Sequence, residues 1–123
     1  MNRQLLWAGL YAALIVALSS IPGHSFPDVK WLTYDKLIHF GEYAVFSVLV
    51  YRAAASLGIK DRLLLGSSII LAGLFGAFDE LYQLLIPGRD SSFADWSADQ
   101  VGAVLGAVSY IWWAQRHDQP SVH

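Results

Sequence analysis

The stretch Asp79–Asp99, which reads DELYQLLIPGRDSSFADWSAD, decides how the rest of the chain is interpreted. It follows the apolar run IILAGLFGAF (residues 69–78), which is typical of a helix buried in lipid. Two carboxylates, Asp79 and Glu80, end that run with no basic residue beside them. A Pro-Gly pair at residues 87–88 then predicts a helix break. Because ionisable side chains are costly at membrane depth, the pattern favours a functional site.

The composition favours an integral membrane protein. The chain has 123 residues, 55% of them hydrophobic and 15% charged, and its mean hydropathy is +0.42. In soluble domains about a quarter of the residues are charged. A membrane helix needs about 20 residues, so this length allows four spans. The net charge of -2 argues against nucleic acid as a partner, and the absence of cysteine excludes disulfides and thiol chemistry.

An all-α, four-helix transmembrane bundle is therefore predicted, as a single domain over residues 1–123. The predicted spans are residues 5–21, 35–51, 63–86 and 93–114. Residues 22–34 and 52–62 are expected to be loops. The first apolar run has an alternative interpretation as a signal peptide, with a small-residue cleavage site at residues 17–19. Its length, and the apolar character of the rest of the chain, favour a span.

The distribution of Lys and Arg between the loops predicts the orientation. One side of the bundle would hold Arg3, Arg52, Lys60, Arg62 and Arg116, and the other Lys30, Lys36 and Arg89. Because cytoplasmic loops carry the excess of basic residues, both termini are predicted to be cytoplasmic.

Polar groups from three spans are predicted to lie at one depth in the outer half of the membrane. His39, Gln83 and Asp99 each lie roughly 6 Å below the outer end of their span, at 1.5 Å rise per residue. Glu42 and Asp79 lie roughly 10–12 Å down by the same arithmetic. Lipid cannot solvate these groups, so they should face one another or a wet cavity.

The predicted layer is acidic. Its carboxylates are Asp35, Glu42, Asp79, Glu80, Asp95 and Asp99. The available cations are Lys36, Arg89 and a protonated His39, and the first two are expected to neutralise two of the acids. Carboxylates in a low dielectric take up a proton, pair with a cation or bind a metal. The remaining charge therefore requires protons, a metal ion or a cationic ligand.

Two segments resemble the motifs of the VanZ-like membrane proteins. The start of the second span reads DKxxHFxxY (residues 35–43), and DExxQxxxPxR (residues 79–89) is followed by SxxD. Gly102 and Gly106 continue the pattern, and such small residues four apart let another helix approach closely. One departure is Asp99, where the family usually has Asn. The resemblance implies a multi-pass protein of the bacterial inner membrane, with a role in the cell envelope and in resistance to lipoglycopeptide antibiotics such as teicoplanin.

The predicted ligand-binding residues are Lys36, His39, Glu42, Tyr43, Asp79, Glu80, Gln83, Arg89, Asp95 and Asp99. As a binding module, the site would take an envelope lipid or a lipoglycopeptide-type amphiphile, with Lys36 and Arg89 on its phosphate or carboxylate. As an enzyme acting on a lipid or cell-wall precursor, it would use His39 with Asp79, Glu80 or Glu42 as acid and base. The same residues could ligate a divalent metal.

Two further interpretations stay open. The polar groups could serve only to lock the helices together, although such contacts in membranes average about 0.6 kcal/mol each, a small return for burying several acids. Alternatively, the acids could relay ions in a transporter. Four helices do not readily enclose a pathway, so that function would need an oligomer.

Overall fold

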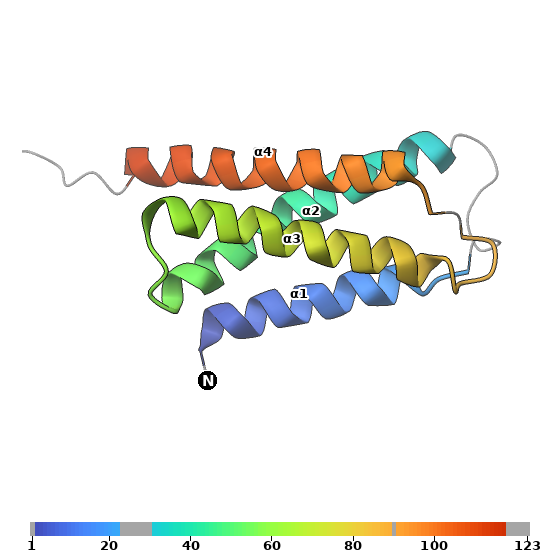
Figure 1. Ribbon diagram of the computed structural model, residues 1–123, viewed down its shortest axis with the longest axis horizontal. Helices are drawn as coiled ribbons and strands as arrows, with labels where there is room; N and C mark the ends of the chain where they lie inside the picture. The colour runs from blue at the N-terminus through green and yellow to red at the C-terminus, as the bar shows by residue number, and fades with distance from the viewer. Residues whose placement is uncertain (1, 23–30, 90, 118–123) are drawn as a thin grey trace, which may run out of the picture.

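The computed structural model describes the backbone of residues 2–22, 31–89 and 91–117 and, apart from residues 31–35 and 61, their side chains. The described residues form the helices α1 (Arg3–Ser19), α2 (Trp31–Ser56), α3 (Asp61–Gln83) and α4 (Phe93–His117), and no strand. The prediction of an all-α fold with four helices is confirmed (Figure 1).

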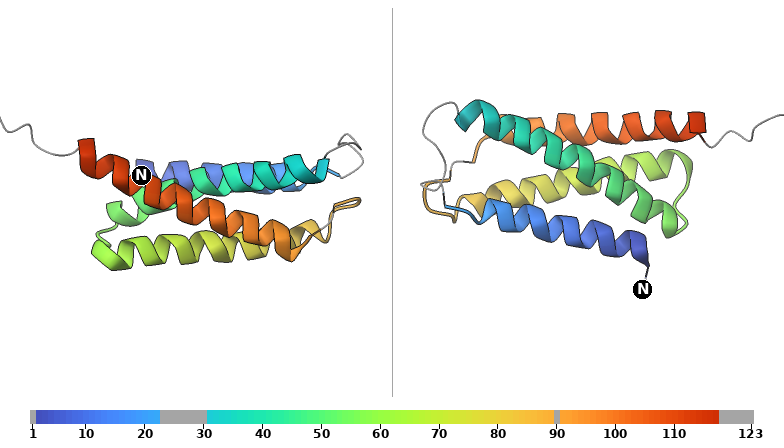
Figure 2. Two further views of the ribbon diagram at one scale, coloured as in Figure 1. Left: turned by 90° about the horizontal axis from the view of Figure 1, so that it is seen from above. Right: turned by 180° about the vertical axis from the view of Figure 1, so that it is seen from behind.

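The helices lie lengthwise beside one another in an elongated bundle (Figures 1 and 2). At one end, here named the α3–α4 end, α3 runs into α4 and α1 finishes. At the other, the α2–α3 end, α2 runs into α3 and the chain begins. Helix α2 contacts all three of its neighbours, most extensively α4. It therefore carries the centre of the packing.

Two glycines of α4 explain its close contact with α2. A Cβ added at Gly102 would overlap the carbonyl oxygen of Phe40, and one added at Gly106 would overlap that of Ala44. Only hydrogen in place of a side chain lets the two backbones lie this close. The helix approach predicted from this pair is confirmed.

An aromatic core lies deeper in the bundle. The Phe46 ring stacks on Tyr11 of α1 with centroids 6.2 Å apart and tilts against Phe75 of α3 at 4.9 Å. Tyr43 meets Phe46 edge-on at 5.9 Å and is fully buried. Such aromatic pairs contribute beyond simple burial of area. They fix the rotation of α2, and so the direction in which its polar residues point.

Several predicted boundaries are wrong. Residues 31–34 were expected in a loop but are helical, while residues 23–30 of that loop lie outside the described residues. Helix α2 continues to Ser56, so the connector is only residues 57–60, with Gly58 at φ 90°. At the chain's far end, α4 runs on to His117 rather than residue 114.

The third helix ends at Gln83 instead of Ile86. Three tight turns follow it, with Leu84 N–H donating to Leu81 O, Leu85 to Tyr82 and Ile86 to Gln83. Pro87 disfavours the helical conformation at the residue before it, so the chain leaves the helix early. Gly88 then turns the chain with φ 75°.

One helix of the described part, Arg62–Gln83, is long and apolar enough to cross a membrane by length and composition. The segment Arg3–Ser19 is apolar but shorter. These findings agree with a membrane protein. The four-span arrangement and the orientation of the termini stay predictions.

Candidate functional site

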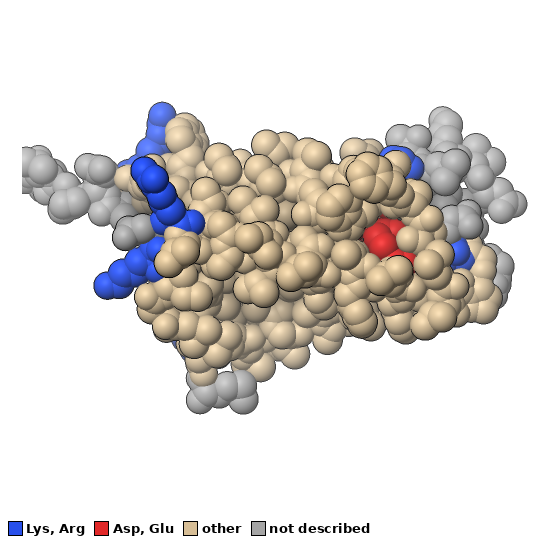
Figure 3. All heavy atoms as spheres, viewed as in Figure 1, with Lys and Arg blue, Asp and Glu red and all other residues tan. Residues whose placement is uncertain are grey.

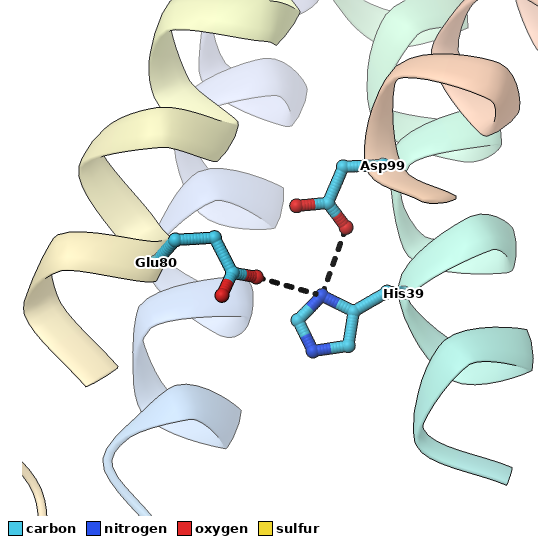
Figure 4. Close-up of side chains that lie close together, drawn as sticks. All are labelled: His39, Glu80 and Asp99. Carbon is cyan, nitrogen blue, oxygen red and sulfur yellow. Dashed lines mark hydrogen bonds and ion pairs between the residues drawn. The ribbon is translucent and has the colours of Figure 1, made fainter. Parts of the chain in front are cut away.

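Three helices bring one imidazole and two carboxylates together at the α3–α4 end (Figure 4). His39 of α2 has its Nδ1 atom 2.8 Å from Asp99 Oδ1 of α4 and 3.5 Å from Glu80 Oε1 of α3. The three side chains, named here the His–carboxylate cluster, are all buried. Helix-depth arithmetic predicted that His39 and Asp99 share one layer, and their contact confirms this, although the arithmetic did not single out the pair.

The helix contact at the glycines explains this short distance. Gly102 stands one turn after Asp99, and its backbone lies against Phe40, the neighbour of His39. Since α2 and α4 approach so closely there, the short Asp99 side chain can reach the ring. Glu80 has one more methylene and reaches the same nitrogen from the more distant α3.

A single ring nitrogen of His39 faces both carboxylates, so it cannot satisfy the hydrogen-bonding needs of both. One proton on Nδ1 can bond Asp99 well, and within the described residues Glu80 Oε1 and Asp99 Oδ2 have no hydrogen-bond partner. The three ligand atoms lie within 4.8 Å of one another. In a tetrahedral site with bonds near 2.1 Å, ligand atoms are about 3.4 Å apart. Small shifts would therefore let the cluster hold a divalent metal.

A second buried branch joins α3 to α1. Gln83 Nε2 donates to Ser19 Oγ at 3.1 Å and to Asp79 Oδ2 at 3.5 Å. All three side chains are buried. Sequence reasoning missed Ser19 as a member of the site, although a serine pair ending an otherwise apolar run was a usable signal.

Asp79 and Glu80 point to different neighbours, as expected for adjacent helical residues about 100° apart. Asp79 faces α1 through Gln83, whereas Glu80 accepts a hydrogen bond from Ser91 Oγ at 3.0 Å. Ser91 was also missed as a partner. Its position in the α3–α4 connection gave no periodic signal.

The cations lie at the rim. Lys36 Nζ is 3.4 Å from Asp95 Oδ1, so its predicted role in neutralising an acid is confirmed. Arg89 donates to the carbonyl oxygen of Ile21 at 3.4 Å, and its charge acts on Asp79.

Two further predicted members of the site, Glu42 and Tyr43, follow His39 one turn along α2. Glu42 is half-buried and within electrostatic range of Tyr11 and Tyr43. Tyr43 packs on Phe46 and Phe75 of the aromatic core. It also lies within electrostatic range of Asp79, Glu80 and Asp99, so it joins the core to the site.

Glu80 also lines a surface groove of about 460 Å³ between α3 and α4. The groove is bordered by Ala77, Leu81, Ser91, Ser92, Phe93 and Trp96. Figure 3 shows Asp or Glu atoms in a hollow near the α3–α4 end. The Trp96 indole N–H donates to Gly73 O at 3.3 Å, which holds this ring at the groove's edge. Glu80 is thus the member of the buried cluster that borders this groove.

Comparison with known proteins identifies the family. The family model described as VanZ/LLP1 matches residues 4–114. No curated protein and no solved structure matches the chain significantly. The matched region includes every residue of the site and nearly all of the four helices, and the chain belongs to the VanZ/LLP1 family.

Proposed function

We propose that this chain is an integral membrane protein that binds the head group of an envelope amphiphile in the groove between α3 and α4. One observation carries the proposal. Glu80 lines a groove open to the side of the bundle and also approaches His39 in the buried cluster. A ligand lying in lipid could therefore place its polar end on buried protein groups without leaving the membrane.

The bundle's apolar exterior supports a lipid environment. Large apolar side chains are exposed along α1, α3 and α4, among them Leu10, Leu14, Ile70, Leu74, Leu105 and Val108. So large an exposed apolar surface favours burial in a membrane. Four spans at residues 5–21, 35–51, 63–86 and 93–114 remain our proposal, in the bacterial inner membrane.

The charge distribution supports the proposed orientation. Lys and Arg side chains gather at the α2–α3 end, whereas near the α3–α4 end Asp or Glu atoms are visible beside some Lys or Arg atoms (Figure 3). By the positive-inside rule the α2–α3 end, with both termini, is cytoplasmic. The groove then opens in the outer half of the membrane, where envelope lipids and antibiotics arrive.

The groove's lining favours a ligand with a hydroxylated or amine-bearing head and an apolar tail. Glu80 can accept from such groups, with Ser91 and Ser92 beside it. Leu81 and Phe93 are exposed along the same groove and suit an acyl chain. Because Lys36 is already paired with Asp95, an anionic head group is less favoured. A lipoglycopeptide or a lipid-linked sugar meets these requirements, and resistance to such an antibiotic would follow from its capture.

Glu80→Gln is expected to weaken binding of teicoplanin to the purified protein in nanodiscs by about tenfold, equivalent to about 1.4 kcal/mol. The amide keeps the side chain's size but loses the charge that an amine would meet. Fluorescence titration would measure the dissociation constants. Glu42→Gln, which removes a carboxylate outside the groove, should bind like the wild type.

A glycopeptide without an acyl chain tests the apolar half of the groove. It is expected to bind at least tenfold more weakly than teicoplanin. Equal affinity of the two antibiotics, or equal losses in Glu80→Gln and Glu42→Gln, would contradict binding in this groove. Absence of binding by the wild type would contradict this choice of ligand.

A second candidate function, a metal-dependent enzyme acting on the same kind of amphiphile, is favoured by the His–carboxylate cluster. His39, Glu80 and Asp99 would hold a divalent ion and leave a further position for water or substrate, as catalytic zinc sites do. The ion would polarise a bound group or activate the water. The groove at Glu80 would admit the substrate.

Metal analysis tests this candidate. The protein purified after growth with added zinc or manganese is expected to hold about one ion per chain, and His39→Ala should lose it, since a zinc site needs its protein ligands. Asp95→Asn, a buried acid outside the cluster, should keep the ion. If the wild type held no more than trace metal after growth with added zinc or manganese, the metal-dependent enzyme would be excluded.

A further inference from the structure

A second groove, of about 570 Å³, lies between α1 and α2 and has no part in the site described above. It includes Arg3 and Arg52 and runs along Trp7, Leu10, Leu14 and Leu49. Arg3 begins α1, and Leu14 stands roughly 16 Å farther along the same helix at 1.5 Å per residue. The groove is therefore cationic at the α2–α3 end and apolar toward the middle of the bundle.

Hydrogen bonds hold the two arginine-bearing helix ends together. The Asn2 side chain caps α1 by accepting from the backbone N–H of Gln4 at 2.9 Å. Its Nδ2 atom donates to Ser56 Oγ, at the end of α2, at 2.9 Å. One asparagine thus fixes the start of α1 against the end of α2, so Arg3 and Arg52 face the same groove.

The described residues offer these arginines no carboxylate counterion. The ion pairs of Lys36 with Asp95 and of His39 with its two acids lie at the opposite, α3–α4 end of the bundle. The first turn of α1 contains no acid either. Two guanidinium groups beside an apolar channel are therefore without a described anionic partner, and a planar guanidinium fork matches phosphate geometry.

We propose that Arg3 and Arg52 bind the phosphate of an anionic phospholipid whose acyl chain lies along Trp7, Leu10 and Leu14. The charged end and the apolar length of the groove match the two halves of such a lipid. Trp7 is exposed near the helix start, where tryptophan suits the membrane interface. In the proposed orientation this end meets the cytoplasmic leaflet, whose anionic lipids attract basic segments. This inference does not depend on the ligand of the α3–α4 groove.

The test measures which lipids stay on the full-length protein. The chain is reconstituted in mixed phosphatidylglycerol and phosphatidylcholine, extracted in mild detergent, and examined by native mass spectrometry. The wild type is expected to retain phosphatidylglycerol at least fivefold over its share of the mixture. Arg3→Gln with Arg52→Gln should bring that enrichment close to one.

Lys60→Gln with Arg62→Gln is the matched control, since it removes two charges at the start of α3, at the same end but outside the groove. It should keep the wild-type enrichment. Equal losses in the two double variants would overturn the site in favour of diffuse attraction, and so would a wild type without enrichment. Excess glycerol phosphate should leave the bound lipid in place, because it lacks the acyl chain. If glycerol phosphate displaced the lipid, the proposed binding of the acyl chain along Trp7, Leu10 and Leu14 would be contradicted.

A charge-conserving variant covers the case in which the Gln variant does not fold. Arg3→Lys with Arg52→Lys keeps the net charge but removes the guanidinium forks. Its enrichment is expected to fall two- to threefold. Unchanged enrichment would contradict recognition of the phosphate by the forks.

Discussion

Gly106→Ala is expected to destabilise the bundle by about 1–3 kcal/mol, the usual cost of adding a methyl group to a packed contact. Its Cβ would overlap the carbonyl oxygen of Ala44, which is backbone and cannot rotate away. Helix α4 would have to move off α2. Combining Gly106→Ala with Gly102→Ala, which meets Phe40 in the same way, should prevent normal packing of α4 altogether.

Gly66→Ala on α3 is the matched control, because a Cβ there meets nothing within 4 Å. Alanine is the better helix former by up to about 1 kcal/mol, so this variant should be as stable as the wild type or slightly more so. Unfolding by sodium dodecyl sulfate in mixed micelles, followed by circular dichroism, would compare the two. Similar free energies of unfolding for Gly106→Ala and Gly66→Ala would contradict the close approach of α2 and α4.

Asp99→Ala is expected to lower the free energy of unfolding by about 1–3 kcal/mol, the cost of leaving a buried polar partner unsatisfied. The substitution removes the acceptor 2.8 Å from His39 Nδ1. Asp99→Asn keeps an oxygen at that position and removes the charge. It should therefore cost less than about 1 kcal/mol, because a neutral amide oxygen still accepts from the ring.

The same unfolding assay separates the two explanations of Asp99. Retained stability in the Asn variant, with loss in the Ala variant, would establish that the acceptor atom matters. Equal losses in both variants would contradict the hydrogen-bond account and would make the charge itself the requirement.

Much of the site could be predicted because its elements depend on helical geometry alone. Residue spacing and a rise of 1.5 Å per residue placed His39 and Asp99 at one depth. Adjacent helix positions separated Asp79 from Glu80. The Gly102–Gly106 spacing predicted where another helix would approach, and the structure identifies that helix as α2.

The remaining features depend on how helices are rotated and on irregular backbone. The sequence paired His39 with Asp79, Glu80 or Glu42, whereas the structure pairs it with Asp99 and Glu80. The glycine contact and the aromatic core determine which acids lie beside His39, because they fix how the helices are rotated. Residue spacing alone does not give that rotation.

The groove of Arg3 and Arg52 shows the same limit at the other end of the bundle. Counting basic residues predicted an orientation, but not which two arginines share a surface. That depends on the bond from Asn2 to Ser56, which joins residues 54 apart in the chain.

The central claim, that His39 and Asp99 from separate helices interact in a buried layer, is tested most directly by a double-mutant cycle. Free energies of unfolding are measured for the wild type, His39→Ala, Asp99→Ala and the double variant. A direct hydrogen bond predicts a coupling energy of about 1 kcal/mol or more between the two positions. Additive effects, with coupling below about 0.3 kcal/mol, would contradict it.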